Sequence, residues 1–145
     1  MRAILQRVSS ASVRVDRELV GEIDKGILVL LGVEKGDTST ELEKLLNKLV
    51  NYRIFNDQNG HMNLSVTDVQ GELLIVSQFT VAADTKKGLR PSFSSAASPD
   101  IAEVLYEEFV ERARKLCKRV AVGRFGADMK VTLTNDGPVT FLLTT

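Results

Sequence analysis

The feature that most constrains the fold is an unbroken apolar run at residues 26–33, Gly-Ile-Leu-Val-Leu-Leu-Gly-Val. The run is far shorter than the roughly 20 apolar residues that a membrane-spanning helix needs, and its length is typical of a β-strand. A strand without a polar face is buried on both sides. We therefore expect this strand to lie in the core, and we place a single domain at residues 1–145.

Two amphipathic segments predict the helices that cover this sheet. Thr38 and Glu41 fit a capping box, followed by leucines at helical spacing. Further on, Ser98 suits an N-cap and Pro99 suits the first helical position. Acidic residues lie toward the start of this second helix and basic residues toward its end. We interpret this order as complementing the helix dipole rather than as an RNA-binding patch. Its expected buried stripe consists of Ile101, Val104, Leu105, Phe109, Ala113 and Leu116.

Alternating apolar and polar residues predict the remaining strands. Such patterns occur before a turn at 16–18, after the turn at 59–60, and at 130–134 and 139–143. A strong strand is expected over residues 72–81, followed by a long loop at 84–98. Two main helices amid a mostly antiparallel sheet predict the α+β class.

Composition excludes several kinds of site. The chain has 19 basic and 19 acidic side chains, so any contact with RNA should be local, because proteins that bind long stretches of nucleic acid are usually basic. The single cysteine, Cys117, excludes an intrachain disulfide, and with His61 it cannot form a Cys/His zinc site. His61 lies in a turn-like segment and is expected at the surface. We predict a cytoplasmic protein without a metal, a cofactor or a membrane segment.

The segment Ser77-Gln78-Phe79-Thr80 is the first candidate for chemistry. Its polar residues follow an apolar run, so its side chains and free N–H groups could point into a pocket and stabilise an oxyanion. Thr80 or Ser77 could instead act as a nucleophile, but each would need a base, and no base is evident nearby. A strand with a polar solvent face remains an equally good interpretation.

Two further segments have ordinary structural interpretations beside functional ones. Residues 135–138, Asn-Asp-Gly-Pro, have turn composition and suggest a hairpin between the last two strands, with a trans bond before Pro138 from sequence alone. Lys86, Lys87 and Arg90 surround Gly88 and could hold phosphates, although a solvated charged loop is the more usual explanation.

Taken together, short motifs along nearly the whole chain resemble one family. In order, they are Gln6-Arg7-Val8, Ala11-Ser12-Val13, residues 26–33, residues 52–55, Met62-Asn63-Leu64, Ser77-Gln78-Phe79-Thr80, Ala83-Asp84-Thr85, Arg90-Pro91-Ser92-Phe93, Gly123-Arg124-Phe125, Ala127-Asp128-Met129 and residues 135–141. In this order and at this length, they resemble the D-aminoacyl-tRNA deacylases.

The resemblance implies a homodimer with a barrel-like β core and an active site at the subunit interface. Its substrate would be the acceptor end of a D-aminoacyl-tRNA, or of tRNA for alanine mischarged with glycine, and its products the free amino acid and tRNA. Ser77, Gln78, Phe79 and Thr80 would line the catalytic pocket, and the tRNA 2′-OH would take part in hydrolysis.

The same resemblance implies a chiral filter. A cis Gly137-Pro138 bond would reach into the partner's pocket, where its carbonyl oxygens face the substrate ammonium and its bulk rejects the L side chain. Arg7 would hold this loop, and Met129 would form a pocket wall. Two rival hypotheses remain open: a conventional esterase with Thr80 as nucleophile, and a non-catalytic RNA-binding module.

Overall fold

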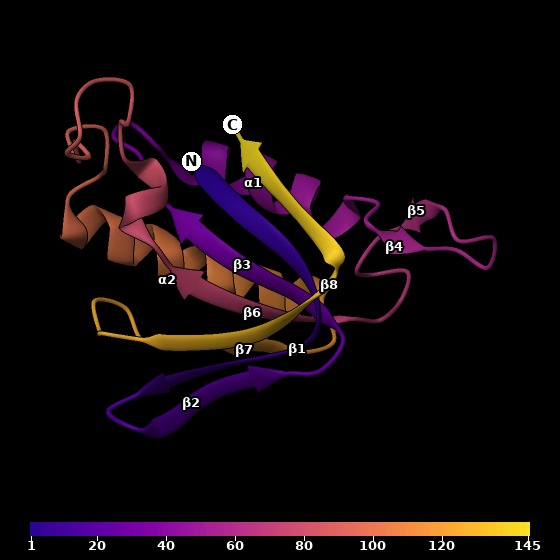
Figure 1. Ribbon diagram of the computed structural model, residues 1–145. Coiled ribbons are helices and arrows are strands. Elements are labelled where there is room, and N and C mark those ends of the chain that lie inside the picture. The colour runs from indigo at the N-terminus through magenta and orange to yellow at the C-terminus, as the bar shows by residue number, and fades with distance from the viewer.

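The computed structural model describes all residues, 1–145, as eight strands, two α-helices and a short 3₁₀ turn (Figure 1). In chain order these are β1 (Arg2–Val15), β2 (Glu18–Ile23), β3 (Gly26–Gly32), α1 (Ser39–Asn51), β4 (Phe55–Asn56), β5 (Met62–Leu64), β6 (Glu72–Ser77), η1 (Phe79–Ala82), α2 (Pro99–Leu116), β7 (Val120–Val122) and β8 (Lys130–Thr144).

Strand β1 organises the main sheet. It pairs antiparallel with β3 and then with β2 along one edge, where Arg7 faces Ile27 and Ala11 faces Ile23 in the same register. The register shifts by one residue between Val13 and Arg14. Strand β8 runs antiparallel to β1 as well. The expected turn after Val15 is present, and its two residues have positive φ, a conformation that matches the twist of a tight hairpin.

The other half of the main sheet is parallel, which corrects the expected balance of strands. Strand β3 pairs parallel with β6, and β6 pairs parallel with β7, so the sheet is mixed. The cause is the connections: α1 lies in the chain between β3 and β6, and α2 lies between β6 and β7. Parallel neighbours require such long crossovers, whereas antiparallel neighbours can be joined by a short turn.

The sheet curls until β2 comes close to β7. A Cβ atom on Gly21 would lie 2.5 Å from the Val122 carbonyl oxygen, so only glycine allows this approach. The nearly closed, barrel-like sheet encloses a small apolar core that includes Val13, Leu28 and Leu74. The α+β class is thus confirmed, and the nearly closed, barrel-like sheet lies within one chain and is mixed rather than mostly antiparallel.

Both helices pack against one face of the sheet and bury the larger core. The capping box of α1 is present, with Thr38 and Glu41 bonding reciprocally. Pro99 opens α2 after Ser98 as predicted, but Ser98 makes no side-chain cap. No helix combines the length and apolar composition needed to cross a membrane.

The buried stripe of α2 differs from the prediction. Ile101, Val104 and Leu116 are exposed by 55%, 63% and 48%, whereas Tyr106 and Val110 are buried. Both stripes satisfy helical spacing, so periodicity could not choose between them. Leu105, Phe109 and Ala113 are buried as predicted, and the tertiary contacts turn α2 so that Tyr106 and Val110 complete the buried stripe.

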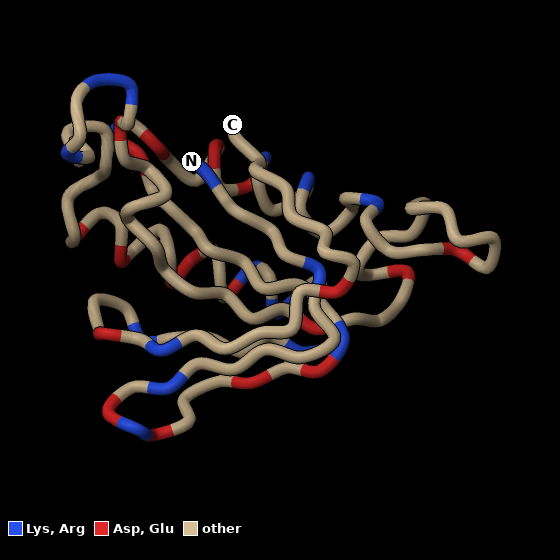
Figure 2. Tube along the Cα trace, in the orientation of Figure 1, with Lys and Arg blue, Asp and Glu red and all other residues tan.

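Two expected strand boundaries also change. The strand predicted over 72–81 ends at Ser77, and the chain then enters the η1 turn, which packs against Gly32. The expected hairpin at 135–138 is absent, because residues 130–144 form one long strand with a bulge. Charged residues are spread along the whole fold, in keeping with the zero net charge (Figure 2).

Candidate active site

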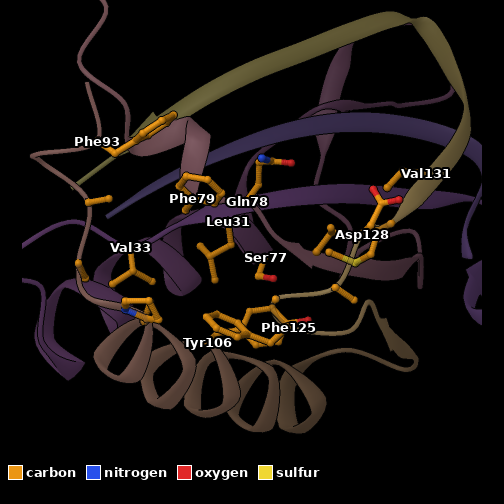
Figure 3. A pocket seen from close by; sticks show the side chains of 18 residues that line it. Leu31, Val33, Ser77, Gln78, Phe79, Phe93, Tyr106, Phe125, Asp128 and Val131 are labelled. Atoms are coloured by element: carbon orange, nitrogen blue, oxygen red, sulfur yellow. The ribbon is translucent and has the colours of Figure 1, made fainter. Parts of the chain in front are cut away.

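A cavity of about 600 Å³ opens where β3 and β6 end (Figure 3). Parallel strands place their carboxyl ends at the same edge of a sheet, and here Leu31 lies beside Ser77. The first half of α2 and the segments around 93–97 and 125–129 complete the wall. Most lining residues are apolar; the polar or aromatic ones are Ser77, Gln78, Phe79, Phe93, Tyr106, Phe125 and Asp128.

The segment after β6, at the edge of this cavity, leaves two backbone N–H groups without an acceptor in its own turn. The Gln78 N–H donates to the Leu31 carbonyl oxygen at 2.8 Å, which fixes the end of the strand. The Val81 N–H then donates to the Gln78 carbonyl oxygen at 3.2 Å and closes the 3₁₀ turn. Because such turns join each N–H to the carbonyl three residues earlier, the N–H groups of Phe79 and Thr80 have no acceptor inside the turn.

Thr80 differs from the three residues before it. Ser77, Gln78 and Phe79 line the cavity, whereas Thr80 is exposed beside it. The Gln78 side-chain amide donates a hydrogen bond to the Thr80 hydroxyl. An amide cannot accept the proton of that hydroxyl as a general base would. The structure thus brings three of the four predicted catalytic residues to the cavity and gives the fourth no basic partner.

Aromatic side chains form much of the wall. The Phe79 and Phe93 rings are 4.9 Å apart, and the Tyr106 and Phe125 rings are 5.8 Å apart below Ser77 (Figure 3). The Tyr106 hydroxyl donates to the Ile75 carbonyl oxygen at 2.9 Å. Burial raises the pKa of Tyr106 to about 12, so its hydroxyl remains protonated at neutral pH.

Met129, which is predicted to form a pocket wall, lines the cavity and also holds its own loop in place. Its sulfur accepts a hydrogen bond from the Arg124 N–H at 3.4 Å. A Cβ atom on Gly123 would lie only 2.6 Å from the same sulfur. Sequence reasoning gave no role to Phe93, Phe125 or Asp128, although each belongs to a family-like motif. Asp128 is the one carboxylate of the lining and pairs with Lys130 at 2.8 Å.

The remaining predicted residues lie together elsewhere, around a bulge in β8. Gln6 and Val8 of β1 are two residues apart, but their partners in β8, Thr140 and Asn135, are five residues apart. Strand β8 therefore has three extra residues at this point. The extra residues project as a loop that contains Gly137 and Pro138, and the peptide bond between these two is cis. None of the bulge residues lines the cavity.

Arg7 fixes the bulge to the rest of the fold. Its Nε donates to the Asp136 carbonyl oxygen at 3.1 Å, and its Nη1 donates to the Ile54 carbonyl oxygen at 2.8 Å and the Asn56 side chain at 3.4 Å. The side chain is buried, with 8% exposure of the residue. A guanidinium is suited to this task because its planar fork presents several donors in fixed directions.

Asn135, to which sequence reasoning gave no separate role, closes the bulge from within. Its Oδ1 accepts from the Val139 N–H at 3.1 Å, and its Nδ2 donates to the Thr140 hydroxyl at 2.8 Å. Gly137 has a φ of +131°, and a Cβ atom there would lie 2.7 Å from Val139 Cγ2. This backbone conformation therefore requires glycine.

The cavity and the bulge of one chain are far apart. On the two sides of β3, Ser77 of β6 pairs with Leu31 and Arg7 of β1 pairs with Ile27. Leu31 and Ile27 are four residues apart along β3. At ~3.3 Å per residue and ~4.8 Å per strand spacing, the Cα atoms of Ser77 and Arg7 lie roughly 16 Å apart. Gly137 and Pro138 project from the next strand beyond Arg7.

Other titratable residues stay outside both regions. His61 is exposed in its turn, as predicted. Cys117 is half-buried, and burial raises the pKa of its thiol to about 11. No three His, Cys, Asp or Glu side chains come together in a group that could hold a metal ion.

Comparison with known proteins identifies the family. The family model described as D-Tyr-tRNA(Tyr) deacylase matches residues 4–144. A D-aminoacyl-tRNA deacylase of Hahella chejuensis is 60% identical over 143 residues, covering 99% of this chain and 98% of the relative. One from Pseudomonas fluorescens is 59% identical over 145 residues, covering both chains completely.

Solved structures agree with this fold. The structure of c-Myc DNA Unwinding Element Binding Protein has a TM-score of 0.96 and 44% identity, covering 100% of this chain and 99% of the other. A probable eukaryotic D-amino acid tRNA deacylase shares the fold at a TM-score of 0.85 and 18% identity, covering 99% and 98%. The family match over nearly every residue, together with relatives about 60% identical, shows that the chain belongs to the D-aminoacyl-tRNA deacylase family, a family of aminoacyl-tRNA hydrolases.

Proposed function

We propose that this protein hydrolyses the ester bond of D-aminoacyl-tRNA mainly by positioning the substrate and stabilising the oxyanion. The observation that carries the proposal is the η1 turn at the cavity, where two N–H groups have no acceptor within the turn and no general base lies at Thr80. Such donors stabilise the negative charge that forms on an attacked carbonyl oxygen. An activated ester held in one orientation needs little further help from acidic or basic side chains.

In this mechanism a water molecule attacks the aminoacyl carbonyl carbon. The carbonyl oxygen becomes an oxyanion opposite the N–H groups of Phe79 and Thr80. The bond to the ribose oxygen then breaks, and that oxygen receives a proton and leaves as the free hydroxyl of tRNA. The adjacent 2′-OH of the substrate assists the proton transfers, while Ser77, Gln78 and Phe79 orient the ester.

The bulge would act as the chiral filter of a partner subunit. Within one chain, roughly 16 Å separate Ser77 from Arg7 by strand geometry, so Gly137 and Pro138 are too distant to contact an ester bound at Ser77. A homodimer resolves this separation if each bulge enters the other chain's cavity. The long outer edge of β8, with Leu142 exposed by 58%, supports association, because unpaired edges readily pair with another chain.

The filter would work by steric rejection. With the ammonium held by the bulge carbonyl groups and the ester held at the η1 turn, an L side chain points into Gly137 and Pro138, whereas a D side chain points away. Glycine has no side chain, so glycine mischarged on tRNA for alanine should also be removed. A built-in clash discriminates more strongly than the loss of a few favourable contacts.

The first test compares the hydrolysis of D- and L-aminoacyl-tRNA by substoichiometric protein. We expect multiple turnovers with the D ester and with glycyl-tRNA, and no acceleration with the L ester. If neither chiral ester is hydrolysed faster than in buffer, the chain is instead a non-catalytic nucleic-acid-binding module. That rival gains some support from the DNA-binding name of one structural relative.

A second test concerns the esterase hypothesis. We expect Thr80→Ala to retain a substantial fraction of wild-type activity, because the Thr80 hydroxyl bonds to the Gln78 amide and to no base. A loss to below about a thousandth of wild type would instead identify Thr80 as a nucleophile.

A third test uses mixed dimers. One protomer lacks Gly137 and Pro138, and the other is disabled in the segment from Ser77 to Thr80. Random mixing makes about half of the dimers mixed, and each mixed dimer has one intact composite site out of two, so the mixture should recover about a quarter of wild-type activity. No recovery would place both motifs in the same chain's site.

A further inference from the structure

A basic loop stands next to the cavity without any role in the hydrolysis described above. We define the basic loop as residues 85–91, which contain Lys86, Lys87 and Arg90. Its two ends are joined by reciprocal hydrogen bonds between Asp84 and Ser92, at 2.8 and 3.0 Å. The loop is therefore held at its base while its cations extend into solvent.

The base of this loop belongs to the cavity wall. Phe93 lines the cavity and packs against Phe79, one residue after the Ser92 bridge. Ser95, two residues further, donates through its hydroxyl to the Ala82 carbonyl oxygen at the end of η1. Arg90 is three residues from Phe93, so their Cα atoms are at most about 11 Å apart. The loop projects beyond the end of the sheet, where its basic positions stand out (Figure 2).

The cations of the basic loop are available to a ligand. Lys86, Lys87 and Arg90 are all exposed, and none makes an ion pair. Asp84, the one carboxylate of residues 84–98, accepts a hydrogen bond from the Lys86 N–H, a bond that organises the loop's backbone. Three cations within five residues make a local basic patch on a chain whose net charge is zero.

We infer that the basic loop binds phosphates of the acceptor strand of tRNA as it leaves the cavity. The inference rests on the proposed function: an aminoacyl ester held at Ser77 to Phe79 places the 3′-terminal nucleotide at the cavity mouth. The phosphates that follow must then cross the rim of the cavity, where Phe93 anchors the loop. Contacts of this kind position a nucleic acid without reading its sequence.

The test compares two substrates with a neutralised loop. The variant Lys86→Gln/Lys87→Gln/Arg90→Gln is assayed on D-tyrosyl-tRNA and on 2′(3′)-O-D-tyrosyladenosine, which has the same ester but no phosphate. The control variant is Lys44→Gln/Lys48→Gln/Lys118→Gln. It lowers the net charge equally with exposed lysines, and none of these lines the cavity.

We expect the loop variant to lose about 20-fold in kcat/KM on D-tyrosyl-tRNA, mainly through KM, and to keep wild-type activity on the adenosine ester. The control variant should keep wild-type activity on both substrates. Each lost phosphate contact on a single strand lowers the salt slope by about 0.7, so three contacts lower it by about 2. Equal losses on both substrates, or no loss on tRNA, would overturn the inference.

Binding of an uncharged acceptor-stem RNA, followed by fluorescence anisotropy, separates this inference from the proposed function. If the wild type hydrolyses neither ester, the hydrolytic proposal fails, and the binding comparison still decides the role of the loop. Weaker, less salt-dependent RNA binding by the loop variant alone supports the loop as the phosphate contact. Equal binding by wild type and both variants contradicts it.

Discussion

The cavity and the bulge differ in what determines the positions of their main-chain groups. At the cavity, a strand ends and a 3₁₀ turn begins, so main-chain N–H groups become available through local geometry. At the bulge, three extra residues are held in place by the side chains of Arg7 and Asn135. Substitutions should therefore affect the bulge far more sharply than the cavity wall, because few side chains determine its shape.

Gly137→Ala should give the largest effect. The new Cβ atom would lie 2.7 Å from Val139 Cγ2 at a φ of +131°, so the bulge must move. A displacement of about 1 Å at a positioned group can cost about 100-fold in rate. We expect a loss of that order in kcat/KM for D-aminoacyl-tRNA and weaker rejection of the L ester. Wild-type values for both esters would show that the bulge plays no part in selection.

Arg7→Ala should be the next most severe change. It removes the donors to the Asp136 and Ile54 carbonyl oxygens and leaves a cavity in a buried position. Loss of hydrogen bonds to a charged group should cost about 2–4 kcal/mol of the free energy of unfolding. Urea unfolding measures this change. Arg7→Lys retains the charge but not the planar fork, so a fully stable lysine variant would contradict the geometric role of Arg7.

Asn135→Ala should have a moderate effect. It removes the acceptor for the Val139 N–H and the donor to the Thr140 hydroxyl, each bond contributing about 1 kcal/mol. We expect the ratio of D to L hydrolysis to fall about 10-fold, and the melting temperature to fall by roughly 4–8 °C because the two bonds together contribute about 2 kcal/mol. Thr140→Val, which removes only one of these two bonds, is the matched control. An equal effect of both variants would argue against the Val139 contact.

Tyr106→Phe, in the cavity wall, should give the smallest effect. At neutral pH the cost should be about 1 kcal/mol, since the Ile75 carbonyl oxygen still accepts from the Gly123 N–H. The pKa of Tyr106 is raised by burial from 10.0 to about 12, so the stability that its neutral form contributes is present below pH 10 and lost between pH 10 and 12. Between pH 10 and 12 the wild type should therefore lose up to about 2–3 kcal/mol more of its free energy of unfolding than the variant does. Parallel pH curves would contradict this assignment.

Local patterns predicted most of the elements. The capping box of Thr38 and Glu41, the strand at 26–33 and the surface position of His61 were all evident because neighbouring residues alone determine them. The buried side of α2 was not, since Ile101 and Tyr106 both satisfy helical spacing and only packing distinguishes them. The parallel pairing of β3 and β6 likewise depends on contacts between residues far apart in the chain.

The sequence by itself determined the α+β class, the two helices and, through its motifs, the family. Only the tertiary structure decided that the strand at Ser77 ends in a 3₁₀ turn, which packs on Gly32. It also decided that residues 135–138 bulge from one strand, because β1 pairs with β8 on both sides of them. Turn composition predicts that the chain bends, and pairing with the partner strand determines whether the bend becomes a hairpin or a bulge.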